Sequence, residues 1–290
     1  MTTQINGETI LEEKDILKLR ELAEQGDAQA QYDLGYYYNN QPEQEKEAFL
    51  WYLRAAERGH AEAQYAVGDC YAIGVGVEEN WEEAFRWYLR SAEQGYAMAQ
   101  FDVAECLSSG TGAEENDEEA VKWYRKSAEG GYAPAQVWMG ILYDEGKVVP
   151  QDSKEAEKWY ALAAEQGDSY GMYNLGCRYF DGEYEEKNYD RAFRLFLLAA
   201  RQELREAFTN LGYCYQMGYG TAINYEKAVE NYRIAANKGD EVAAFNLAEC
   251  YELGQGVEKD LTEALKWYKY AAERGDKEAQ EKINKLLKST

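Results

Sequence analysis

The sequence predicts an all-α solenoid of seven helix pairs, with one further helix at each end. The first observation is a repeated glycine at a spacing of 36 residues, found at Gly59, Gly95, Gly131 and Gly167 and again at Gly239 and Gly275. The second is that each copy between these glycines carries two apolar stripes with helical spacing. A helix pair of this size cannot bury its apolar face alone, so the copies are expected to stack.

The glycines divide the chain into copies that follow one another without gaps. Gly26 opens a shortened first copy, and Glu203 stands where one of the repeated glycines is missing. The copies span residues 27–59, 60–95, 96–131, 132–167, 168–203, 204–239 and 240–275. Residues 8–26 and 276–290 each resemble a lone half of a copy, and we expect them to form capping helices. The whole chain, residues 1–290, is then expected to be one capped, monomeric solenoid domain.

The first helix of each copy has a recurrent packing frame. In the first copy the frame includes Leu34, Gly35 and Tyr38, whose spacing places them on one helical stripe. The glycine lets a neighbouring helix approach closely, although it lowers helix propensity. Ala104 and Ala248 replace it in two copies.

The second helix has its own pattern, as in "EAFRWYLRSAEQG", in which Trp87 and Tyr88 are expected to pack and Gly95 to end the helix. Glycine suits that position because it adopts the left-handed conformation at low cost. The turn between the two helices contains Gly74 and Gly76. These glycines do not indicate a phosphate-binding loop, because they follow a helix and no Lys-Ser/Thr pair comes after them.

The motif "AEAQYAVGDCYAIGVGVEENWEEAFRWYLRSAEQG" and its sister copies resemble Sel-1-like repeats (SLR), which are relatives of tetratricopeptide repeats (TPR). The resemblance covers nearly the whole chain. It implies a right-handed α/α superhelix that acts as an adaptor or scaffold between proteins. Some secreted members of the family have two cysteines per repeat that form an internal disulfide, whereas each copy here has at most one.

The composition excludes several kinds of partner. Thirty-one basic and 54 acidic residues give a formal net charge of −23, which opposes binding to nucleic acid or to an anionic membrane. The first residues lack the basic and apolar regions of a secretory signal, so we expect a cytoplasmic protein. One repeat position holds four of the five cysteines, Cys70, Cys106, Cys214 and Cys250. Stacked helices lie too far apart to join them, so buried, reduced thiols are expected.

Few residues suit catalysis. His60 is the single histidine, and it stands where Asp27 and Asp168 open their copies, so we expect it to begin a helix. One histidine without clustered cysteines gives a transition metal almost no ligands, and we expect neither metal nor cofactor.

Paired acids in the turns, such as Glu78 with Glu79 or Glu185 with Glu186, suggest an enzyme that acts on a small molecule or a glycan. They fall at helix starts, where carboxylates suit the helix dipole. We therefore predict a protein that is not an enzyme, with the enzyme kept as an alternative.

Binding residues are expected where the copies differ while the frame stays fixed. On the first helices, the positions outside the frame form one continuous stripe, which we call the first-helix stripe. By resemblance to related solenoids, this stripe lines the concave surface. Its candidate partner-binding residues are Asp33, Tyr36, Asp69, Met98, Asp102, Glu105, Trp138, Ile141, Tyr170, Asn174, Asn210, Tyr213, Asn246 and Glu249. The stripe begins acidic, becomes apolar around Trp138 and Ile141, and ends with a row of asparagines.

The predicted function is that of a non-catalytic adaptor or scaffold that holds an extended or helical segment of a partner protein. The acidic charge suggests a partner with a basic patch, since complementary charge raises the association rate. An acidic immunity protein that neutralises one toxin or effector is a second hypothesis. Copy five has an irregular turn, "DGEYEEKNYD", which indicates either a drifted repeat or a dedicated binding site.

Overall fold

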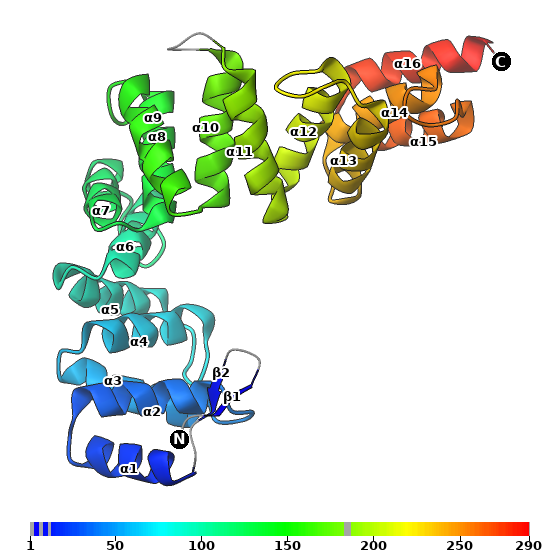
Figure 1. The fold of residues 1–290 in the computed structure, drawn as a ribbon. Helices are drawn as coiled ribbons and strands as arrows, with labels where there is room; N and C mark the ends of the chain where they lie inside the picture. The colour runs from blue at the N-terminus through cyan, green and yellow to red at the C-terminus, as the bar shows by residue number, and fades with distance from the viewer. Residues whose placement is uncertain (1–2, 6–7, 11–12, 183–186, 290) are drawn as a thin grey trace. The chain divides into compact units, whose positions relative to one another are not determined.

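The computed structural model describes residues 3–5, 8–10, 13–182 and 187–289. In these ranges the chain forms sixteen α-helices (Figure 1), and consecutive helices pack against each other from α1 to α7 and from α9 to α16. A short hairpin of β1 (Thr3–Ile5) and β2 (Glu8–Ile10) precedes them. The prediction of an all-α solenoid is confirmed.

The helices follow the predicted copies in pairs. The first helices are α2 (Ala28–Asn39), α4 (Ala61–Ile73), α6 (Ala97–Ser109), α8 (Ala133–Glu145), α10 (Ser169–Asp181), α12 (Arg205–Met217) and α14 (Glu241–Leu253). The second helices are α3 (Glu45–Glu57), α5 (Trp81–Glu93), α7 (Asp117–Glu129), α9 (Ser153–Glu165), α11 (Tyr189–Arg201), α13 (Tyr225–Asn237) and α15 (Leu261–Ala272).

Both expected end helices are present, with one change of boundary. The first, α1 (Glu13–Glu24), begins at Glu13 and not at residue 8, because Glu8–Ile10 pairs as a strand with Thr3–Ile5. It packs against α2, where the Gln31 side chain donates to the carbonyl of Ala23 at 2.9 Å. The last helix, α16 (Lys277–Ser289), packs against α15 and buries Ala279.

The chain divides into two compact units. The first unit comprises residues 1–139 and 147–150, and the second comprises residues 140–146 and 151–290. Helix α8 contributes residues to both.

Close approach between the two helices of a copy depends on the frame glycine, as the sequence predicted. A Cβ atom at Gly68 would lie 2.5 Å from Cδ1 of Tyr88, which is buried on the second helix. A turn glycine, Gly112, has a left-handed backbone, with φ +73°, and a Cβ there would clash with the carbonyl oxygen of Trp81. That turn therefore packs directly on the start of the second helix of the preceding copy.

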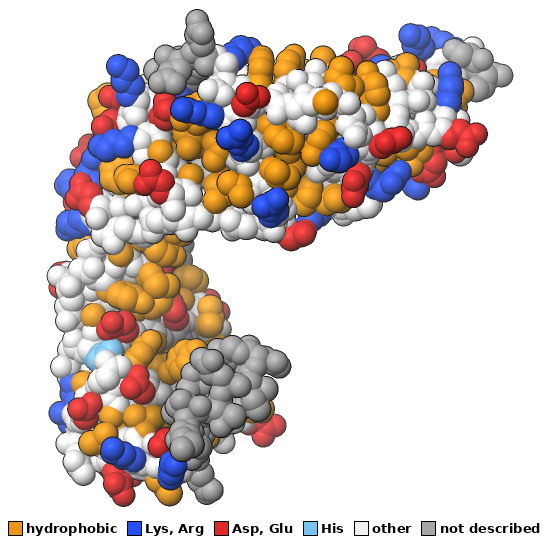
Figure 2. Space-filling view, in the orientation of Figure 1, with side chains coloured by type: hydrophobic (Ala, Val, Ile, Leu, Met, Phe, Trp, Pro, Cys, Tyr) orange, Lys and Arg blue, Asp and Glu red, His pale blue; other side chains and the backbone are white. Residues whose placement is uncertain are grey.

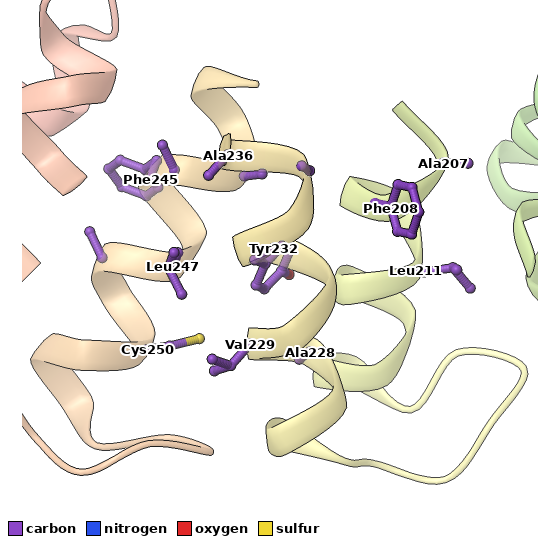
Figure 3. Packing of buried hydrophobic residues seen from close by; sticks show 14 of the residues in the cluster. Ala207, Phe208, Leu211, Ala228, Val229, Tyr232, Ala236, Phe245, Leu247 and Cys250 are labelled. Atoms are coloured by element: carbon purple, nitrogen blue, oxygen red, sulfur yellow. The ribbon is translucent and has the colours of Figure 1, made fainter. Parts of the chain in front are cut away.

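The two units join their copies by different chemistry. In the first unit, buried side chains bond to the backbone of the neighbouring copy, as when Gln64 donates to Ala56 at 3.1 Å and Gln100 to Ala92 at 3.1 Å. In the second unit the glutamine position holds apolar residues such as Phe208. The core cluster there includes Phe208, Leu211, Tyr232, Phe245 and Leu247, as Figure 3 shows.

Glu203 replaces the terminal glycine of copy five and keeps its backbone conformation. Its φ is +64°, in the left-handed region where Gly167 and Gly239 have φ +87° and +99°. The chain turn is thus preserved although a side chain is present. A non-glycine residue in this region carries a strain of about 1–2 kcal/mol.

Candidate partner-binding surface

In the first unit, the first-helix stripe stays accessible to solvent. Trp138 is 39% exposed and Tyr36 is 60% exposed. The side chains of Asp69, Asp102 and Glu105 are half-buried. The polar stripe positions therefore lie between the core and the solvent, where a partner can reach them.

Tyrosine hydroxyls connect the acidic residues of neighbouring first helices. The Tyr65 hydroxyl, on α4, interacts with the carboxyl groups of both Asp69 on α4 and Asp102 on α6 and favours their ionised forms. Tyr88, from the second helix α5, donates to Oδ1 of Asp69 at 2.8 Å. The stripe thus brings two carboxylates from successive copies to the same tyrosine.

Burial disfavours the charge of these carboxylates. It raises the pKa of Asp69, and it raises the pKa of Asp102 to about 6. The hydrogen bond from Tyr65 opposes the rise at Asp102, while the charges of Asp69 and Glu105 add to it. Desolvation and crowding with like charges both destabilise an ionised acid. A cation from a partner would relieve this destabilisation.

Trp138 is connected through Tyr124 to Glu105, the third acidic residue of the group. Its ring stacks on Tyr124, with centroids 5.9 Å apart and planes inclined by 23°. The hydroxyl of Tyr124 donates to Glu105. An exposed aromatic face next to a carboxylate suits a Lys or Arg side chain, because the ring attracts a cation and the carboxylate pairs with it.

The remaining stripe residues of the first unit have weaker contacts. Asp33 is exposed and accepts from Nε2 of Gln29 at 2.9 Å. The sulfur of Met98 accepts from the hydroxyl of Tyr96 at 3.2 Å.

Nδ1 of His60 accepts from the backbone N–H of Ala63 at 3.2 Å, which confirms the predicted role of His60 at a helix start.

In the second unit, the stripe residues around copy five line a small polar cavity. Nδ2 of Asn210, in copy six, donates to the sulfur of Cys177, in copy five, at 3.7 Å. Asn174 and Cys177 line the cavity, which has a volume of about 170 Å³, together with Asp144 and Arg178. The volume is far below that of a typical pocket for a small-molecule ligand.

The other predicted residues of the second unit are not equally available. Nζ of Lys282 on α16 pairs with Glu249 at 2.6 Å, so the end helix already occupies this carboxylate. Tyr170 is 54% exposed, and Tyr213 is 38% exposed beside the ring of Phe180. Two further predicted residues, Ile141 and Asn246, are half-buried.

Sequence reasoning missed the second-helix tyrosines as hydrogen-bond donors. Tyr88 and Tyr124 reach stripe acids, whereas Tyr160 donates at 2.8 Å to Asp144, which lies outside the stripe and pairs with Arg178. The recurring tyrosine is visible in the sequence, but the pattern indicated only its packing.

The described residues show no activated nucleophile. All five cysteines are free. Burial raises the pKa of Cys70 to about 11 and that of Cys106 to about 12, so these thiols stay protonated and weakly nucleophilic at neutral pH. Glu185 and Glu186 lie outside the residues that the structure describes.

Two further kinds of site are missing from the part of the chain that the structure describes. No group of three His, Cys, Asp or Glu side chains is placed to hold a metal ion there. No helix among the same residues combines the length and the apolar character needed to span a membrane.

Comparison with known proteins agrees with this architecture. The Sel1 repeat matches seven segments, residues 28–60, 61–96, 97–132, 133–168, 169–204, 206–240 and 242–276. No curated protein matches the sequence.

Two solved structures are similar to the chain over most of its length. A protective antigen with an SLR fold, present in uropathogenic Escherichia coli strains, is 32% identical with a TM-score of 0.82. That match covers 93% of this chain but only 59% of the antigen. A Sel1 repeat protein from Oxalobacter formigenes is 33% identical with a TM-score of 0.71, over 88% of this chain and 96% of its own. The chain therefore belongs to the Sel1 repeat family.

Proposed function

We propose that this protein is a non-catalytic adaptor that binds a cationic, extended segment of a partner protein on the first-helix stripe of its first unit. Sel1 repeat proteins generally mediate protein–protein interactions. The observation that carries the proposal is the exposed ring of Trp138, stacked on Tyr124, whose hydroxyl donates to Glu105.

The arrangement of charges suggests the spacing of the partner's basic residues. Packed helices lie about 8–10 Å apart, so acids on successive first helices repeat at about this distance. An extended chain rises about 3.3 Å per residue. A segment with Lys or Arg at every third position would therefore place one cation near Asp69 and Asp102 and the next near Glu105 and Trp138.

The stripe of the second unit supports a weaker, less charged contact. Its asparagines, Asn174, Asn210 and Asn246, carry amides that can donate to and accept from a peptide backbone. We propose that this row holds the backbone of the same kind of segment. We also propose that the adaptor is a cytoplasmic monomer, since its free cysteines suit a reducing compartment.

The proposal can be tested with a defined probe and a matched pair of variants. The probe is a fluorescein-labelled peptide with arginine at every third position and serine between, compared with a peptide in which glutamine replaces arginine. Binding to the full chain is measured by fluorescence anisotropy. Trp138→Ala should weaken arginine-peptide binding about tenfold, because the cation loses the face of the ring.

The matched control is Trp81→Ala. Trp81 has nearly the same exposure as Trp138, 37%, but begins the second helix α5. This variant should bind the arginine peptide like the unchanged protein. Equal binding by both tryptophan variants would mean that the peptide responds only to the overall negative charge, and it would overturn the proposal.

A further inference from the structure

Four of the seven second helices, α5, α7, α9 and α15, share a charge pattern on their solvent face. A glutamate in the first turn pairs with a basic residue three positions later, as in Glu83–Arg86, Glu119–Lys122, Glu155–Lys158 and Glu263–Lys266. A second glutamate stands at or next to the helix end, at Glu57, Glu93, Glu129, Glu165 and Glu273. Each basic residue on these faces is thus balanced by neighbouring acids.

Helix α11 reverses this pattern. It carries Arg191, Arg194 and Arg201 at the three positions, and all three are exposed. Arg191 donates to the hydroxyl of Tyr179 at 3.4 Å. Among the described residues, Arg194 and Arg201 have neither a hydrogen bond nor an ion pair. Within the part of the chain that the structure describes, the face therefore presents two guanidinium groups without an ion pair, in a chain of net charge −23.

An apolar side chain lies between these arginines. Leu198 is 41% exposed, and steps of three, four and three residues place it on the same face as the arginines. The same position in the first unit holds Arg54, Arg90 and Lys126, each of which lies over a tryptophan ring of its own helix. Figure 2 shows Lys and Arg side chains with hydrophobic side chains between them over the surface where Figure 1 places α10 and α11.

Stability of the helix does not explain the reversal. Arginines three residues apart repel each other, whereas the glutamate of the other copies would attract Arg194. Exposure of the Leu198 side chain does not stabilise the protein either, because apolar surface is favoured only when it is removed from water. The pattern suits contact with another molecule.

We infer that the face formed by Arg191, Arg194, Leu198 and Arg201, here called the α11 face, is a docking surface for an acidic segment of a partner protein. Guanidinium groups pair with carboxylates through two parallel hydrogen bonds. The first and last arginines lie about 15 Å apart along the helix, at 1.5 Å per residue. A helical segment with glutamates about three turns apart and leucines between them fits this face.

A protein segment fits the α11 face better than a nucleic acid or an anionic membrane. Screening limits the attraction of the face to about 8–10 Å. A longer polyanion would extend beyond the face onto a chain with an excess of 23 acidic charges. Leu198 also requires an apolar contact, which phosphate groups do not supply.

The inference is tested with the full chain and a fluorescein-labelled helical peptide of Glu, Leu and Ala, in which two glutamates at each end flank central leucines. The double variant Arg191→Glu with Arg201→Glu introduces the residue type that most other copies carry at these positions. It should remain folded and weaken peptide binding at least tenfold. The double variant Arg86→Glu with Lys122→Glu, on the solvent faces of α5 and α7, is the charge-matched control and should weaken binding less than twofold.

Three results would overturn the inference. The peptide could fail to bind at millimolar concentration, or the Arg191→Glu with Arg201→Glu variant could bind it as well as the charge-matched control does. The third is equal displacement of the peptide by a single-stranded oligonucleotide or by phosphatidylserine vesicles, since this would assign the face to phosphate groups. Binding of a peptide with glutamine in place of glutamate should be lost if carboxylates are recognised.

Discussion

Asp102 should lower the stability of the protein at neutral pH, and its replacement by asparagine should raise it. The pKa of Asp102 rises from 3.8 to about 6 on folding, chiefly through burial. At 1.36 kcal/mol per pKa unit, ionisation of this residue in the folded state costs about 3 kcal/mol. Asparagine keeps an oxygen that can accept from Tyr65, but its new amide group needs a partner. We therefore expect Asp102→Asn to stabilise by about 2 kcal/mol.

The sign of the effect sets its dependence on pH. Below about pH 4 the aspartate is protonated in both the folded and the unfolded chain, so it imposes no penalty. Because the folded pKa is the higher one, the penalty develops as the pH rises from about 4 to 6 and is complete above 6. The advantage of Asp102→Asn should accordingly be small at pH 4.5 and full at pH 7.5.

Urea unfolding followed by circular dichroism at pH 4.5, 6 and 7.5 provides the assay. Asp33→Asn is the control, since Asp33 is exposed on α2, and it should change stability by less than about 0.5 kcal/mol at every pH. Equal stability of Asp102→Asn and the unchanged protein at pH 7.5 would refute the reasoning. An advantage that is largest at pH 4.5 would also refute it.

Three further predictions concern the repeat frame. Glu203→Gly should raise the free energy of unfolding by about 1 kcal/mol, because it relieves the left-handed strain. Gly95→Ala should lower the free energy of unfolding by a similar amount, since it introduces the same strain at a site with open space around it. Gly112→Ala should lower it by more than about 2 kcal/mol, since its Cβ meets the Trp81 carbonyl, and thermal unfolding should report the difference from Gly95→Ala. Deleting residues 276–290 removes the cover of α15 and should cause self-association in analytical ultracentrifugation; a monomer with an unchanged melting curve would contradict the capping role of α16.

Much of the fold was predictable because the same pattern of packing residues recurs from copy to copy. Gly35 and Gly68 each face a tyrosine of the second helix, so a single copy could have suggested the contact and seven copies made it secure. The first helical residue was not predictable in the same way. Residues 8–26 read as one helix, yet Glu8–Ile10 pairs with Thr3–Ile5, and no repeat in the sequence constrains that segment.

The candidate surface was predictable as a stripe but not as a set of contacts. Helical spacing places Asp102 and Glu105 on one face of their helix, and the 36-residue repeat places Asp69 at the position equivalent to Glu105 in the preceding copy. It does not reveal that tyrosine hydroxyls already bond to them, or that Lys282 of the last helix takes up Glu249. Such contacts depend on distances between helices, which the periodicity of a single helix does not contain.

The central claim is that a cationic segment binds beside Asp102, and carboxyl-carbon NMR of this residue tests it most directly. The Asp102 signal is assigned by its loss in Asp102→Asn and is titrated with and without the arginine peptide. In the free chain the pKa should be about 6. The pKa of Asp102 should fall below 5 in the saturated complex, because a nearby cation favours the ionised carboxylate. An Asp102 pKa that stays at about 6 while the peptide is bound would contradict binding of the cationic segment beside this residue.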